Sequence, residues 1–355
     1  MDFLQFLILQ LLHKCRGERS LNGIIHLLRG KRSAQTIQDI MLFDLQPYAA
    51  MLKHWKQYDV NSNVTELKVK GLIRNTEKVA CLTGVGLKKL KDATVLYEIP
   101  LQFNGLKYEW DNTAEHVWQS IALLVQSISY LKLNQSQFIP ISYHHSAQAT
   151  VRNIVLKHGN VSRMGEQVYN ELTNMLQTLP DEKAALFVKR LTSSDSVGKT
   201  YDQLASHFHN DALYTFILFR EVIHIVIRHI KQTSKYPILS QVVPEKRMPL
   251  NLTYTAEITR KLLMNGYTRD EIANRRTLKK STIEDHIIEI AIHDENFNYQ
   301  PYITTEQLLL IEKTAKKLQT NKLKIIKDHL NENVSYFQIR LALSRKRRDL
   351  HANDT

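Results

Sequence analysis

The chain has 355 residues, enough for two or three domains, and its 43% hydrophobic and 23% charged residues are typical of folded globular protein. With only 11 glycines and 8 prolines a loop-rich all-β fold is disfavoured, and apolar residues at helical spacing predict a mainly α, multi-domain helical protein. The net charge of +13 favours a polyanionic partner, because lysine and arginine release condensed counterions when they pair with phosphates. Many bacterial proteins are basic for other reasons, so charge alone does not decide the partner.

The cysteines and the apolar runs indicate the compartment. Cys15 and Cys81 form no metal-spaced cluster and no disulfide framework, which favours a reducing environment. The run Phe3–Leu12 is short, contains two glutamines, and lacks both a basic segment before it and a small-residue cleavage site, so we interpret it as a buried helix. The longer stretch Ala212–Ile230 is interrupted by charged residues. We therefore expect a cytoplasmic or nucleoid-associated protein without a membrane segment.

Residues 1–105 form the first block, which we expect to be a helical domain. Gly71-Leu72-Ile73, a polar turn, and the strand-like Val79–Thr83 closed by Gly84 follow its helices. Many winged-helix domains pass from their last helix into a β-hairpin through such a pattern. The block is therefore either winged-helix-like or a plain helical bundle with one hairpin. Its helix-like stretches are Phe3–Cys15, Leu21–Leu28, Ala34–Phe43, Tyr48–Lys56 and a shorter apolar repeat at Val64–Leu72.

Residues 112–235 form the second block, a predicted helical bundle in which no residues suggest a chemical role. Pro237, Pro244 and Pro249 follow in a stretch without periodicity, and proline restricts both itself and its predecessor. We therefore interpret residues 236–251 as a linker. The predicted helices of the bundle are Ala114–Leu133, Ala147–Lys157, Gly165–Leu179, Glu182–Leu191, Tyr201–Phe208 and Leu213–Ile230.

The third block, residues 252–348, begins with a helix-turn-helix pattern. A first helix, Thr255–Met264, would end at Gly266, which can take the left-handed conformation that closes a helix. Thr268 and Glu271 have the spacing of a capping box and would start a short second helix. Ile272 and Ala273 would face inward, and alanine is small enough to let another helix cross closely.

A turn over Arg275–Lys280, with Leu278 as its apolar plug, leads to the last helix of the pattern. This helix is predicted to start near Ser281, where Ser281 and Glu284 offer a second capping box. Its inward face would be Ile283, Ile287 and Ile290 or Ala291, and its outward face Lys279, Lys280, Thr282, Asp285 and His286.

Such a helix can lie in the DNA major groove with its first turn nearest the bases and phosphates. Helix N-termini favour phosphate through their free N–H groups and their dipole. A basic segment from Lys313 onward adds charge, and Tyr336 and Phe337 within it could stack on unpaired bases or pack a small core. The alternative is a three-helix unit that packs against the rest of the chain or binds another protein and does not contact DNA. The predicted DNA-binding residues are Arg275, Arg276, Lys279, Lys280, Ser281, Thr282, Asp285 and His286, together with Arg345, Lys346, Arg347 and Arg348 in the basic tail.

The Glu-Ile-Ala…Thr-Ile-x-x-His pattern resembles the helix-turn-helix of response-regulator and sigma-factor-like proteins, although Arg276 and Thr277 stand where that pattern usually has Leu and Gly. The closer resemblance is to the helicase helix-turn-helix domain at the C-terminus of RecQ-type helicases. That domain also occurs in the stand-alone YpbB proteins of Gram-positive bacteria, which are encoded beside a RecQ-like helicase. The matching segments are Thr253–Gly266, Glu271-Ile272-Ala273 followed by Arg276, Ser281–Glu284 with His286, Leu323–Leu330, Val334–Arg340 and, near the N-terminus, His26–Asp39.

Other patterns in the chain carry little weight. Val197–Thr200 is reminiscent of a phosphate-binding loop, but the glycine required five positions before Gly198 is replaced by Ser193. His207, His209 and Asp211, and the pair Glu221 and His224, have metal-like spacings without a second pair to complete a site. No nucleophile elbow, zinc-protease helix or paired catalytic carboxylates are present, so we expect neither an enzyme nor a cofactor.

The resemblance implies an accessory protein that works with a RecQ-type helicase. We therefore expect a non-catalytic DNA-binding protein that acts with such a helicase on duplex, forked or junction DNA in DNA repair or recombination. The alternatives are a sequence-specific transcription regulator that uses the C-terminal helix-turn-helix, and a protein-interaction scaffold that binds no DNA.

Overall fold

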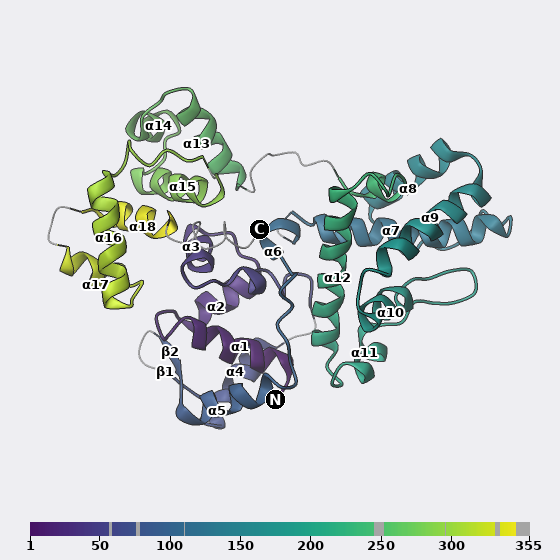
Figure 1. The fold of residues 1–355 in the computed structure, drawn as a ribbon, viewed down its shortest axis with the longest axis horizontal. Helices are drawn as coiled ribbons and strands as arrows, with labels where there is room; N and C mark the ends of the chain where they lie inside the picture. The colour runs from purple at the N-terminus through teal and green to yellow at the C-terminus, as the bar shows by residue number, and fades with distance from the viewer. Residues whose placement is uncertain are drawn as a thin grey trace. The chain divides into compact units, whose positions relative to one another are not determined.

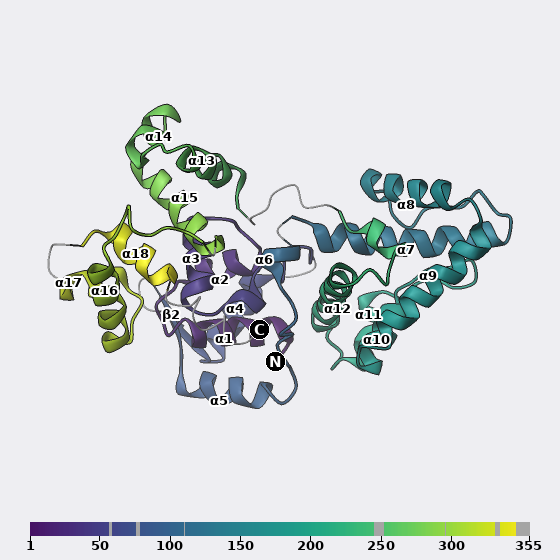
Figure 2. The ribbon, with the colours of Figure 1, turned by 45° about the horizontal axis from the view of Figure 1, so that its top comes forward.

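The computed structural model describes residues 1–56, 59–75, 79–109, 111–244, 252–294, 296–330 and 334–345 (Figures 1 and 2). Within these residues the protein is mainly α-helical, with one two-stranded hairpin, and the expected fold class is confirmed. None of the helices described there is long and apolar enough to cross a lipid bilayer.

The contacts between residues divide the chain into two compact units. The first consists of Met1–Leu9, Pro47–Leu72 and Gly84–Lys246, and the second of Gln10–Gln46, Ile73–Thr83 and Arg247–Thr355. Helix α1 (Phe3–Lys14) and the 3-10 turn η1 (Gln46–Tyr48) contribute residues to both units. Residues 1–105, expected as a single block, are thus shared between the units, and the three expected domain boundaries stay predictions.

The first unit is built around one long apolar helix, α12 (Ala212–Gln232), which packs against α7, α10 and α11 (Figure 1). Side chains such as Ile217, Phe219, Val222 and Val226 are fully buried because every face of this helix is covered. The other elements are α4 (Val60–Val69), α5 (Gly84–Ala93), α6 (Gly105–Tyr108), α7 (Thr113–Lys132), α8 (His145–His158), α9 (Val161–Leu176), α10 (Asp181–Lys189), α11 (Tyr201–Leu204), η2 (Ala205–His207) and η3 (Leu239–Val242).

Two polar residues of α12, Arg220 and His224, belong to a buried ionic network. Arg220 donates from Nε and Nη2 to the two carboxylate oxygens of Glu109 at 2.9 and 2.6 Å. The Nδ1 atom of His224 accepts the backbone N–H of Asn104, so its Nε2 carries the proton and donates to Glu109 at 2.7 Å. Burial alone would raise the pKa of Glu109, but Arg220 and His224 hold it well below its usual value. Removing charged groups from water costs free energy, and the pairing of opposite charges in this network offsets that cost.

The second unit places helix α15 (Lys280–His293) at its centre. Helices α3, α13, α14 and α18 all pack against α15, so segments from the beginning and the end of the sequence share one core. The buried Ile287, Ile288, Ile290 and Ala291 of α15 form much of that core. The other helices of this unit are α2 (Leu21–Leu28), α3 (Ala34–Leu42), α13 (Tyr254–Met264), α14 (Arg269–Arg275), α16 (Thr305–Leu318), α17 (Leu323–His329) and α18 (Tyr336–Arg345).

The predicted hairpin is confirmed. Strand β1 (Ile73–Asn75) pairs antiparallel with β2 (Ala80–Leu82), with Arg74 opposite Cys81. The polar turn between them, residues 76–78, lies outside the described residues. The hairpin belongs to the second unit and α4 to the first, and a winged-helix-like domain in residues 1–105 stays a prediction.

One local prediction in the first block is wrong. The expected helix Tyr48–Lys56 is a series of turns, because Ala50 has a left-handed φ of +60° that breaks a right-handed helix. Strand β2 ends before Gly84, as expected, and Gly84 begins α5, whose Gly86 lies so close to the carbonyl of Leu72 that no side chain would fit.

Candidate nucleic-acid interface

Local capping positions the short helix α14. Gly266 follows the end of α13 with a φ of +84°, a conformation that glycine adopts without strain. The Thr268 hydroxyl then accepts the N–H of Glu271 at 3.3 Å, and the Glu271 carboxylate accepts the N–H of Thr268 at 2.8 Å. This reciprocal capping box is the predicted one, and Ile272 and Ala273 are buried as expected.

The turn into α15 differs from the prediction in its cap. Helix α15 begins at Lys280 with Lys279 as its N-cap, and no side chain caps it. The predicted capping box of Ser281 and Glu284 is therefore wrong. Ser281 already lies inside the first helical turn, and Glu284 instead accepts a hydrogen bond from Nη1 of Arg269 at 2.7 Å.

The start of α15 is exposed and carries positive charge. Arg275, Lys279, Lys280 and Ser281 are exposed, and Thr282 is half-buried. Lys280 pairs with the exposed Asp270 on α14 at 2.9 Å, a solvent-screened ion pair that a phosphate could replace at little cost. Backbone N–H groups without a side-chain cap, beside two lysines, form a favourable environment for an anion.

Two residues predicted to contact DNA, Arg276 and His286, form hydrogen bonds within the domain. His286 was expected on the outward face, but only 8% of it is exposed, and its Nδ1 is 2.9 Å from the Thr259 hydroxyl of α13. Arg276 turns inward and donates to the carbonyl of Thr255 at 2.8 Å and to the hydroxyl of Thr259. The outward orientation of His286 was therefore wrong, because α13 packs over this part of α15.

The rest of α15 is unavailable to a DNA groove. From His286 to Ile292 every residue of the helix is buried. Asp285, half-buried at the edge of this region, forms an ion pair with Arg340 of α18 at 2.7 Å, and Arg340 also donates to Gln38 of α3. Only the first turn of α15 can therefore approach the bases or backbone of a duplex.

Comparisons with known proteins agree with this geometry. A family model described as a helix-turn-helix domain matches residues 255–343, which span α13 to α18. Protein YpbB of Bacillus subtilis (strain 168) is 31% identical to the chain over 351 residues, and the match covers 98% of each protein. No solved structure matches the chain.

The chain belongs to the YpbB family. In this YpbB-family protein, the helix-turn-helix domain is of the DNA-binding class and includes more than the predicted three-helix motif. Helices α16, α17 and α18 extend it, and α18 completes the core beneath α15.

The basic tail of this YpbB-family chain is described only as far as Arg345. The guanidinium of Arg345 lies over the ring of Tyr299 at 5.9 Å. Lys346, Arg347 and Arg348, also predicted to bind DNA, lie outside the described residues. Of the two aromatic residues nearby, Phe337 is buried in the core and Tyr336 is 45% exposed.

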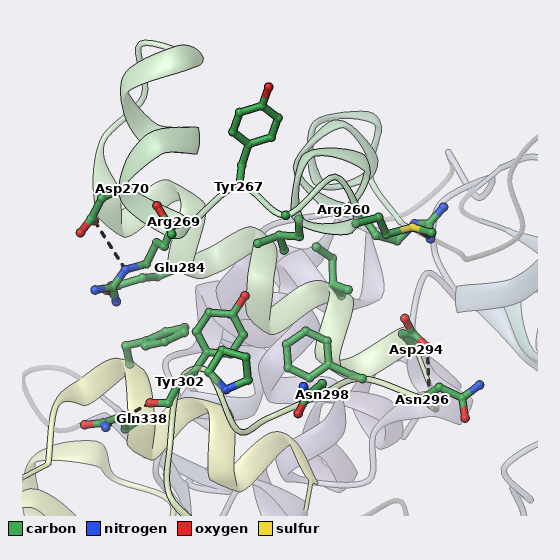
Figure 3. Close-up of a pocket in the computed structure, with 18 of the residues that line it drawn as sticks. Arg260, Tyr267, Arg269, Asp270, Glu284, Asp294, Asn296, Asn298, Tyr302 and Gln338 are labelled. Carbon is green, nitrogen blue, oxygen red and sulfur yellow. Dashed lines mark hydrogen bonds and ion pairs between the residues drawn. The ribbon is translucent and has the colours of Figure 1, made fainter.

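A groove of about 880 Å³ lies beside the helix-turn-helix, between α13, the start of α14 and the segment before α16 (Figure 3). Phe297 and Tyr302 stack in its wall with their rings 5.8 Å apart. Its two arginines, Arg260 and Arg269, are already paired with Glu257 and Glu284. Asp270 and Asp294 also line the groove, so it does not extend the positive surface at the start of α15.

The residues with metal-like spacings and the loop around Gly198 lie within the described residues. Within the described ranges, no three histidine, cysteine or acidic side chains are grouped as metal ligands. The loop around Gly198 packs against α10, where the Gly198 N–H binds the Thr192 hydroxyl and the Lys199 N–H binds the Lys189 carbonyl. Thr200 then caps α11, as expected for a loop that enters a helix.

The ion pairs that hold the interface helices together could not be identified from the sequence patterns. The pair Arg269 and Glu284 joins α14 to α15, and the pair Asp285 and Arg340 joins α15 to α18. Arg340 was counted only as part of a basic tail. No local signal identifies its partner, because the two residues are far apart in sequence and meet only in the folded core.

Proposed function

We propose that this chain is a non-catalytic DNA-binding accessory protein that works with a RecQ-type DNA helicase in DNA repair or recombination. The observation that carries the DNA part is the exposed, uncapped and lysine-bearing start of α15 within a helix-turn-helix domain. Phosphates bind such a helix start through its free N–H groups and its dipole. The helicase part is supported by the resemblance of the domain to the helicase helix-turn-helix of RecQ-type helicases.

The same geometry favours recognition of DNA form over DNA sequence. Base reading by a helix-turn-helix uses several side chains along the outward face of its third helix. In α15 that face is reduced to one turn, since Asp285 is paired with Arg340 and His286 is buried. Selection from random duplex DNA is therefore expected to give no sharp consensus. A sharp consensus would instead favour the transcription regulator.

DNA binding is tested by fluorescence anisotropy with single-stranded, duplex and forked DNA over a series of salt concentrations. Replacing Lys279 and Lys280 with glutamate is expected to weaken binding and to lower the dependence of affinity on salt by about 1 unit of slope per lost phosphate contact. The matched control replaces Lys88 and Lys89, exposed lysines of α5, with glutamate, so that the net charge changes equally. Equal affinity and slope in the two variants would exclude the start of α15 as the contact surface.

The helicase partnership is tested separately. Purified RecQ-type helicase from the same organism is mixed with the chain, and co-elution and the rate of unwinding of forked DNA are measured. We expect co-elution and a changed unwinding rate, together with no nuclease or ATPase activity of the chain alone. An unwinding rate that stays constant over a range of chain concentrations, with separate elution of the two proteins, would refute the partnership.

A further inference from the structure

Helices α16, α17 and α18 repeat the arrangement of the helix-turn-helix that precedes them. Helices α13, α14 and α15 have 11, 7 and 14 residues, and α16, α17 and α18 have 14, 7 and 10. In each set the first and second helices both pack against the third. Ile326 of α17 is buried like Ile272 of α14, and each lies in the short second helix.

The two sets differ in which helix is exposed. Helix α18 packs against α3, α15, α16 and α17, and its side chains from Leu341 to Ser344 are buried. Its Arg340 is engaged by Asp285 and Gln38. The third helix of the second set is therefore a core helix and cannot enter a DNA groove. The outer surface of this set comes from α16 and α17, which lie side by side (Figures 1 and 2).

That outer surface is strongly positive. Leu308, Ile311 and Ala315 are the buried face of α16, and its lysines fall on the opposite face at spacings of three and four residues. On α17, Lys324 and Lys327 share a face away from the buried Ile326. None of these lysines forms an ion pair with a described acidic residue. We call this the α16–α17 lysine surface, and it comprises Lys313, Lys316, Lys317, Lys322, Lys324 and Lys327.

The helix dipole accounts for only some of these lysines. Lys316 and Lys317 lie in the last turn of α16, where the helix dipole favours cations. Lys322 and Lys324 precede and open α17, where the dipole gives no such benefit. Glu312 and Asp328 flank these fifteen residues, so the six lysines between them leave an excess of positive charge, which a polyanion would neutralise. Leu309 and Leu310 are also exposed on α16, one helical turn before Lys313.

The lysine surface continues into a groove of about 840 Å³ formed by the ends of α1, α3 and α16. Lys316 lines this groove together with His13 and Arg16, both of which are exposed. Two acidic residues, Glu18 and Asp44, also line the groove, and Glu18 is engaged by the Thr320 hydroxyl and the Asn321 N–H. The groove therefore extends the positive surface beyond α16.

We propose that the α16–α17 lysine surface is a second contact surface for nucleic-acid phosphates, separate from the start of α15. The proposal rests on the proposed function, because it requires DNA as the ligand of this unit. Helix α18 packs against α15 and also against α16 and α17, so one rigid core carries both positive surfaces. The first turn of α15 holds one DNA segment, and the lysine surface holds the backbone of a second, as at a fork or junction.

The experiment compares two variants with equal changes in charge. In the first, Lys313, Lys317 and Lys324 are replaced with glutamine, and in the second, Lys88, Lys89 and Lys91 of α5 are replaced with glutamine. All six residues are exposed, so both variants are expected to keep the helical content and melting temperature of the wild type. Affinity for forked DNA is measured by anisotropy from low to high salt.

We expect the first variant to bind forked DNA roughly ten- to a hundredfold more weakly, with a salt slope lower by up to about 2.7, or 0.9 for each lost contact. The α5 control is expected to match the wild type. If the first variant also matches the wild type while the glutamate variant of Lys279 and Lys280 is weakened, the lysine surface is refuted and the proposed function stands. If the wild type binds no DNA at all, both proposals are refuted.

Discussion

The buried His286 predicts that the second unit loses stability in mildly acidic solution. Burial, and to a smaller extent the nearby Arg276 guanidinium, lower the pKa of this imidazole from 6.5 to about 4. The imidazole is therefore neutral in the folded protein at pH 5, whereas in the unfolded chain it is mostly protonated. The unfolded state then binds more protons than the folded state, so stability falls as the pH drops from 6.5 towards 4.

The magnitude follows from the two pKa values. With 6.5 in the unfolded chain and about 4 in the folded protein, moving from pH 7.5 to pH 5 costs about 2 kcal/mol, since one pKa unit corresponds to about 1.36 kcal/mol. Other groups also titrate in this range, so the measured quantity is a difference between proteins. Replacing His286 with asparagine removes the titration and keeps an amide near the Thr259 hydroxyl that now contacts Nδ1.

The assay is urea unfolding of both proteins at pH 7.5 and pH 5. Trp55 and Trp118 lie in the first unit, so their fluorescence reports that unit and serves as an internal control, and the third tryptophan, Trp110, lies outside the described residues. Far-UV circular dichroism adds the second unit, and the NMR shift of the His286 ring gives its pKa directly. Between the two pH values the wild type is expected to lose about 2 kcal/mol more than the variant. Parallel losses, or an NMR pKa near 6.5, would refute the reasoning.

Three further predictions concern the same unit. Thr277 has a left-handed φ of +52°, so Thr277→Gly should stabilise the protein by roughly 0.5 kcal/mol. Inside α15, Thr282→Gly should instead destabilise it by roughly 0.3–0.5 kcal/mol, and thermal unfolding measures both changes. The partly exposed pair of Asp285 and Arg340 should show a coupling energy of about 0.5–1 kcal/mol in a double-mutant cycle, and a value near zero would mean that solvent screens it. A fragment of residues 252–355 should melt below the second unit of the whole chain because it lacks α3, and equal melting would show that α3 adds little.

Local signals in the sequence predicted the elements that depend on near neighbours. The capping box of Thr268 and Glu271 and the left-handed Gly266 involve residues a few positions apart, and both are present as expected. The inward face of α15 was also predicted, since the spacing of Ile283 and Ile287 follows the helical period.

Contacts between residues that are distant in the sequence could not be predicted from local patterns. His286 was placed outward because a polar residue beside lysines suggests a solvent-facing position, yet Thr259 and the packing of α13 draw it inside. Nothing near Arg340 in the sequence identifies Asp285 or Gln38 as its partner. The packing of α3 on α15 was equally inaccessible, because most of the first unit lies between these helices in the sequence.

The packing of α15 explains why charge should dominate this interface. Most of the helix forms the core of the second unit, held by α3 and α18 from outside the three-helix pattern, and only its first turn projects. A helix fixed in this way cannot tilt or slide into a groove to bring further side chains to the bases. Binding energy must then come mainly from phosphates, and discrimination must come from where positive surfaces are placed on one rigid body. Under the two proposals, the start of α15 and the α16–α17 lysine surface, joined through α18, would recognise how two DNA segments are arranged rather than which bases they contain.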